Sequence, residues 1–208
     1  MAGGLCNTSF IGFPLIKSYF GEEYISIAII SDQMTFLLFA SIALLIAGYY
    51  SGAKSIQLKT LPKQLIQFPP FIATCIALIL PSSIGFHPIE NCFSILGATV
   101  APLALFSIGL QLKFSNWRNE MGKMAPVFVF KLMIAPALVF LFVFIGKFKV
   151  EFAQVAVFES AMPVLMSLSI LCERFQLKPQ LANLLIGFSI LFGFISTFIW
   201  QHLLIQFL

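Results

Sequence analysis

The chain has 208 residues, of which 60% are hydrophobic and 10% are charged, and its formal net charge is +4. A soluble domain carries about 25% charged residues, so this composition excludes an ordinary soluble protein and predicts an integral membrane protein. The few basic residues fall mostly between hydrophobic runs, which suits loops near lipid headgroups and argues against a nucleic-acid partner.

The cysteines and the known catalytic motifs give no sign of a metal site or of an enzyme. Cys6, Cys75, Cys92 and Cys172 stand far apart without a C-x-x-C pair, so we expect small buried hydrophobic residues. The chain has no H-E-x-x-H, no G-x-S-x-G and no aspartates paired at helical spacing. We therefore expect no catalytic residue, no bound metal and no organic cofactor, and an intramembrane enzyme is a weak third interpretation.

The first apolar segment, residues 5–20, is polar and breakable. At about sixteen residues it is shorter than the twenty that a spanning helix needs. It contains Asn7, Thr8 and Pro14, and proline interrupts helical hydrogen bonding. These features predict one half of a discontinuous helix, and an interfacial amphipathic turn remains the alternative.

Residues 24–50 form a second apolar segment, interrupted only by Ser31, Asp32 and Gln33. A carboxylate at that depth costs about 2.5 to 3.5 kcal/mol, so we expect Asp32 to face the interior of the helix bundle. Either Asp32 has a functional role or it merely bonds to a neighbouring helix, and the sequence leaves both interpretations open.

A loop at residues 51–64 carries three lysines and no acid, so the positive-inside rule places it in the cytoplasm. Two further spans follow, at residues 65–80 and 91–112, and Pro102 is expected to kink the second of them. Small residues in that span favour close helix packing.

Residues 124–146 form a fifth span that contains Lys131 about two turns from its start. Lys131 either extends its ammonium group to the membrane surface or reaches inward as a countercharge for an anion. The last span, residues 179–204, ends with Trp200 and His202, which suit an interfacial anchor.

The most informative stretch lies within the apolar segment 152–172, where Glu159, Ser160 and Pro163 stand close together. Proline removes one backbone donor and blocks the carbonyl four residues earlier, so the helix breaks there. A membrane tolerates such a break only where it faces protein or water, and an ionisable residue at that depth indicates a functional site. The stretch predicts a broken helix at a transporter's binding site.

Two proline-broken segments, each followed by a polar turn and a long apolar span, suggest an internal repeat. We predict an all-α polytopic protein with about six or seven transmembrane helices, part of an inverted repeat of five plus five spans. Residues 1–50 would be the remnant of the first repeat, residues 51–64 the loop, and residues 65–208 the second repeat of five helices. About three further spans would then precede this chain, unless the repeat is a coincidence of proline and apolar periodicity.

Several motifs resemble the auxin efflux carrier family, which includes the plant PIN-FORMED carriers and bacterial permeases for malonate. They are N-T-S-F-I-G-F-P-L-I-K-S-Y-F-G-E-E (7–23), A-P-L-A-L-F-S-I-G-L-Q-L (101–112), K-L-M-I-A-P (131–136) and A-M-P (161–163). The resemblance implies ten spans in two inverted repeats, with the fourth and ninth helices broken and crossing at the midplane. It implies that Asn7 and Pro163 mark the crossing points, with Pro14 further along the first broken helix.

The expected function is therefore secondary transport of a small organic anion, such as malonate, malate or an auxin-like acid, by alternating access. Half-helix N-termini carry unpaired N–H groups that suit a carboxylate. The expected substrate contacts are Asn7, Thr8, the Ser160 hydroxyl and the backbone of Met162, Pro163 and Val164. Asp32 and Glu159 are candidates for coupling to a proton or to Na⁺, because a buried carboxyl group can take up a proton near neutral pH. Lys131 is a further candidate for coupling.

Two alternatives concern the state of the chain. It could be a truncated, transport-inactive fragment, or a half-transporter that needs an N-terminal partner, and a homodimer is also open. The short, uncharged stretch before the first apolar segment predicts no signal peptide, which favours a multi-pass protein of a bacterial inner membrane.

Overall fold

The computed structural model describes residues 1–51, 72, 76, 79, 87–111 and 117–207. Within these residues the regular elements are helices, and three of them are long and apolar enough to cross a membrane: Glu22–Ser51, Trp117–Gly146 and Pro179–Phe207. The prediction of an all-α polytopic membrane protein is confirmed. The predicted loop 51–64 and span 65–80 lie almost entirely outside the described residues.

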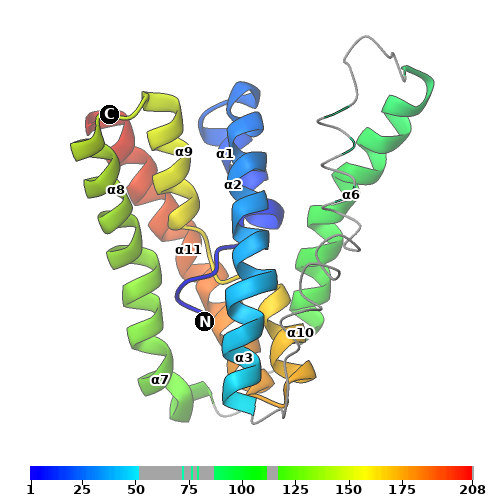
Figure 1. The fold of residues 1–208 in the computed structure, drawn as a ribbon, viewed down its shortest axis with the longest axis vertical. Coiled ribbons are helices and arrows are strands. Elements are labelled where there is room, and N and C mark those ends of the chain that lie inside the picture. The colour runs from blue at the N-terminus through cyan, green and yellow to red at the C-terminus, as the bar shows by residue number, and fades with distance from the viewer. Residues whose placement is uncertain (52–71, 73–75, 77–78, 80–86, 112–116, 208) are drawn as a thin grey trace.

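The helices follow the predicted order along the chain (Figure 1). The first broken segment contains η1 (Thr8–Gly12) and α1 (Phe13–Tyr19). The next span combines η2 (Glu22–Tyr24), α2 (Ile25–Leu38), η3 (Phe39–Ala43) and α3 (Leu44–Ser51). After α6 (His87–Gln111), another span combines α7 (Trp117–Val129), η5 (Phe130–Ile134) and α8 (Ala135–Gly146). The second broken segment is α9 (Val150–Ser160) and α10 (Ser167–Arg174), and α11 (Pro179–Phe207) ends the bundle.

Helix ends differ from the predicted ends because polar residues extend the helices beyond their apolar parts. The span predicted at 91–112 begins at His87, and the span predicted at 124–146 begins at Trp117. Its added first turns carry an exposed Glu120–Lys123 ion pair at 2.7 Å. Hydrophobicity therefore predicted the part of each helix that suits the bilayer, but it did not predict the polar turns at the helix ends.

Pro136 explains how α8 is joined to α11. A proline in a helix leaves the carbonyl four residues earlier without its usual donor, which here is the carbonyl of Leu132. That carbonyl accepts hydrogen bonds from Ser196 Oγ at 2.8 Å and from Trp200 Nε1 at 3.0 Å, both on α11. The Trp200 indole N–H thus serves a contact between two helices, and its role as an interfacial anchor stays a prediction.

Replacing Trp200 by phenylalanine should lower the free energy of unfolding by about 1 kcal/mol, the usual contribution of one hydrogen bond. Removing the Ser196 hydroxyl as well should cost about 1 to 3 kcal/mol more, because the buried Leu132 carbonyl then has no donor. Titration with a denaturing detergent measures both values. Phe198→Leu, at an exposed position on the same helix, is the control and should change the stability by less than about 0.5 kcal/mol.

Aromatic packing holds the first broken segment against the second. The fully buried Phe158 ring of α9 makes edge contacts with Tyr19, at a centroid distance of 5.6 Å, and with Phe20, at 5.1 Å. Helix α2 also packs along α9, so these three segments lie side by side in the centre of the bundle (Figure 1). This packing brings the two helix breaks together.

Candidate functional site at the helix crossing

The two helix breaks pair with each other through their backbones. The Asn7 N–H donates to the Pro163 carbonyl at 2.9 Å, and the Leu165 N–H donates to the Leu5 carbonyl at 3.1 Å. Cys6 and Val164 lie opposite each other in this short antiparallel bridge. Each break thus satisfies polar groups of the other, which is what irregular backbone in a membrane requires.

Helix α11 supports the second break from another side. The ring of Pro163 lies so close to Gly193 that a Cβ there would be 2.6 Å from Pro163 Cγ. The Val164 N–H donates to Ser189 Oγ at 3.0 Å, and this hydroxyl in turn donates to the Ile186 carbonyl at 2.8 Å. Sequence reasoning missed Ser189 and Gly193, although small and polar residues on an apolar helix indicate close packing in membranes.

Free backbone donors are more numerous at the first break than at the second. The first helical bond of η1 runs from the Gly12 N–H to the Asn7 carbonyl at 3.2 Å, so residues 8–11 have no helical acceptor for their N–H groups. At the second break, the N–H groups of Met162 and Val164 already donate to Glu159 and Ser189. The expected substrate contacts from Met162 and Val164 would require those bonds to open, and they stay predictions.

The structure limits the roles that the sequence predicted for Ser160 and Pro14. The Ser160 hydroxyl donates to the Val157 carbonyl of its own helix at 2.6 Å, which leaves its oxygen only as an acceptor. Pro14 lies near the start of α1, directly after the wide turn η1, and the helix runs on through it. The wide turn η1 accommodates the N–H group that Pro14 lacks, so the helix does not break there. The first break is therefore at Asn7.

Lys131 is buried at the crossing, with 1% of its surface exposed. Its ammonium group donates to the Ser160 carbonyl at 3.1 Å, at the C-terminal end of α9, and contacts Cys6 Sγ. Within the described part of the chain no carboxylate forms an ion pair with it. The interpretation that Lys131 extends to the membrane surface is wrong: its charge faces the negative end of a helix dipole.

Asn7 and Glu159 are buried polar residues with unused side chains. Asn7 is fully buried and Glu159 is 2% exposed, and none of their side-chain N or O atoms has a hydrogen-bond partner among the described residues. Both lie next to Gly12, where a Cβ would be 3.5 Å from the Asn7 carbonyl and 3.8 Å from Glu159 Oε1. Buried polar atoms without partners are rare in proteins and usually have a function.

Asp32 approaches the same place from α2. Its carboxylate accepts a hydrogen bond from Thr8 Oγ1 at 2.5 Å, the Ser31 hydroxyl lies beside the Glu159 carboxyl group, and the charge of Asp32 acts on that carboxyl group. Asp32 therefore faces the bundle interior, as predicted. The bond to Thr8 agrees with the interpretation that Asp32 bonds to a neighbouring helix. A functional role for Asp32 stays a prediction.

Thr8→Val should lower the free energy of unfolding by about 1.5 to 3 kcal/mol, because it removes a hydrogen bond to a charged acceptor. Thr8→Ser keeps the hydroxyl and should retain most of the wild-type stability. Unfolding in a denaturing detergent measures the difference. Equal stability of the valine and serine variants would contradict the contribution of this bond.

These helices define a polytopic membrane protein whose two broken helices cross inside the bundle. A family profile described as "Membrane transport protein" matches residues 2–201. The chain therefore belongs to this family of membrane transporters, the auxin efflux carrier family.

Two curated relatives have the same overall character. The chain is 27% identical over 209 residues to an uncharacterized transporter of Methanothermobacter thermautotrophicus, covering 98% of this chain and 67% of the relative. It is 27% identical over 211 residues to another uncharacterized transporter, from Methanocaldococcus jannaschii, covering 97% of this chain and 66% of the relative. The chain thus spans about two thirds of the length of these relatives. Both are archaeal, so they do not support the expectation of a bacterial membrane.

No solved structure matches the chain.

Proposed function

We propose that this chain moves a small organic anion, such as a short dicarboxylate or an auxin-like acid, by secondary transport with alternating access at the crossing. The observation that carries the proposal is the buried ammonium group of Lys131, which lies at the two helix breaks without a carboxylate partner in the described residues. Burying a charge is costly unless it is paired, so a site of this kind suits an anionic ligand.

The arrangement of charges favours one side of the crossing for that anion. Lys131 contacts Cys6 and Ser160, whereas the neighbours of Glu159 are Gly12 and the polar groups of α2. The contacts of the ammonium and of the carboxylate therefore involve different residues. A substrate carboxylate would bind beside Lys131, within reach of free N–H groups of η1, and away from Glu159.

The backbone bridge also suits alternating access. Two backbone hydrogen bonds join the breaks directly, and the segments on either side would rotate about this short contact. In transporters with two broken helices, one bundle rocks against the other around a fixed midplane site. Asn7 and Pro163 would form the pivot.

Purified protein in proteoliposomes tests the proposal with labelled malonate, malate and indole acetate. We expect saturable uptake of at least one acid, and saturable binding in detergent. Asn7→Ala should lose the binding while the protein still inserts and folds. If none of the three acids binds or is taken up by folded protein, the organic-anion proposal is wrong.

A further inference from the structure

The side chains around Glu159 contain more hydrogen-bond acceptors than donors. Both carboxylate oxygens of Glu159 and the amide oxygen of Asn7 are buried without partners among the described residues. Asp32 adds a second carboxylate from α2, and its bonded Thr8 adds a hydroxyl oxygen. Thr8 of η1, Asp32 of α2 and Glu159 of α9 thus bring oxygen atoms to one place, and the backbone of Asn7 at the first break lies beside it, next to Gly12.

The charges at the crossing do not balance. Asp32 faces Glu159 from α2, and Lys131 approaches the end of α9 from η5. Two acids and one base meet there, and no ion pair joins them in the part of the chain that the structure describes. An anionic substrate would add a further negative charge. A bound cation would offset this excess, and oxygen ligands are those that hard cations prefer.

We infer that Glu159, Asn7 and Asp32, assisted by Thr8, form a sodium site beside the helix crossing. The inference rests on the proposed function, because a coupled cation has a role only if a second solute is transported. Ends of broken helices are where membrane transporters hold their coupling ions. The described residues contain no group of three His, Cys, Asp or Glu side chains that could hold a metal ion, which favours a monovalent cation over a divalent one.

A sodium ion fits the unpaired atoms better than a proton does. A proton on Glu159 would create a new donor and would leave the Asn7 amide oxygen unpaired. A sodium ion can take oxygens from Glu159 and from Asn7 together. The amide N–H₂ of Asn7 then remains as a donor for the carboxylate of the substrate. Asn7 would thus link the cation to the anion, which gives the two solutes a direct route of coupling.

Thermal unfolding of the purified chain in detergent tests the site without any substrate. The buffer is free of sodium and holds the ionic strength constant with choline. Adding sodium should raise the unfolding temperature saturably, by about 3 to 6 °C at a concentration of about ten times its Kd. Potassium at the same concentrations should have a smaller effect. Equilibrium binding of radioactive sodium to the wild-type chain gives a second, direct measurement.

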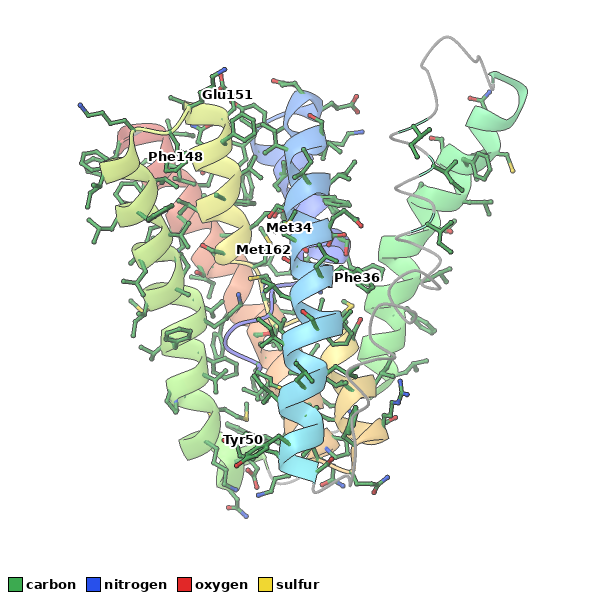
Figure 2. The ribbon with its side chains drawn as sticks, viewed as in Figure 1. Met34, Phe36, Tyr50, Phe148, Glu151 and Met162 are labelled. Atoms are coloured by element: carbon green, nitrogen blue, oxygen red, sulfur yellow. The ribbon has the colours of Figure 1, made fainter. Side chains whose placement is uncertain are left out.

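Three variants at two positions test the ligands. Glu159→Gln should abolish the sodium response, and Asn7→Ala should weaken it about tenfold or more, whereas Asn7→Asp, which keeps an oxygen, should retain it. Glu151→Gln is the matched control, because Glu151 is exposed at the opposite end of the same helix (Figure 2). If a variant fails to fold, the ion selectivity and the direct sodium binding of the wild-type chain still test whether the site exists.

The outcomes separate the site from the transport function. No sodium binding by the wild-type chain, an equal response to potassium and choline, or an unchanged response in Glu159→Gln would overturn the site. Stabilisation by low pH alone, with no effect of sodium, would also overturn it and would indicate a proton. Sodium binding without any anion binding would support the site and contradict the proposed organic-anion transport.

Discussion

Replacing Lys131 by methionine is expected to lower anion uptake by about 10- to 100-fold, while the protein still folds. A charged hydrogen bond contributes about 1.5 to 3 kcal/mol, and each 1.4 kcal/mol changes a binding constant tenfold. Methionine has a similar length and no charge, so it fills the same space in the bundle. Replacing a buried charge by a well-packed apolar side chain is often neutral for stability. The loss should therefore appear in transport far more than in folding.

Uptake into proteoliposomes, measured with the acid that the wild-type chain takes up best, checks this result. Lys131→Arg keeps the positive charge and should retain more activity than the methionine variant. Lys149→Met removes an exposed charge near the start of α9 and should leave uptake unchanged. Wild-type uptake by Lys131→Met would show that the ammonium group supports only the end of α9 and does not bind the substrate.

Local sequence features predicted the broken helices well. The proline and the polar residues of 157–169 interrupt an apolar segment, and the structure ends α9 at Ser160 and starts α10 at Ser167. Asp32 likewise had a clear physical signal, since a carboxylate in an apolar span is too costly to face lipid. These predictions depend only on near neighbours in the chain, which the sequence shows directly.

Contacts between residues far apart in the sequence were not predicted. Lys131 looked close enough to a helix end to reach the surface, but the fold brings Ser160, 29 residues away, to its ammonium group. The unpaired atoms of Asn7 and Glu159 could not be foreseen, because pairing depends on which side chains the other helices present. A residue's depth in a span can be read from the sequence, whereas the partner that it faces cannot.

The two broken segments are joined in a way that agrees with the predicted repeat without testing it. Cys6 and Val164 face each other in an antiparallel bridge, and the two hydrogen bonds around them are equivalent in pattern. Met162, two residues before Val164, lies against the first segment, because a Cβ at Gly12 would be 3.8 Å from Met162 Cγ. The proposed boundaries of the repeats, at residues 50 and 65, stay predictions.

Gly193→Ala is expected to disturb the crossing more than a glycine-to-alanine substitution at any other described helical glycine. The new Cβ would lie 2.6 Å from Cγ and 3.2 Å from Cδ of Pro163, whose ring is rigid, so α11 or the break itself must move. Overpacking of this kind costs about 1 to 3 kcal/mol. We expect a lower unfolding temperature and, because the pivot is displaced, a loss of uptake.

Gly122→Ala is the matched control, because a Cβ at Gly122 of α7 meets no described atom within 4 Å. There the same substitution should stabilise the helix by about 0.5 to 1 kcal/mol, so the two variants should shift the unfolding temperature in opposite directions. Combining Gly193→Ala with Pro163→Ala should recover part of the lost stability, because the shorter side chain leaves room for the methyl group. If the double variant is as unstable as the sum of the single ones, the damage does not arise from contact with the proline ring. In that case Pro163 acts only by breaking the helix, and α11 does not hold the crossing in place.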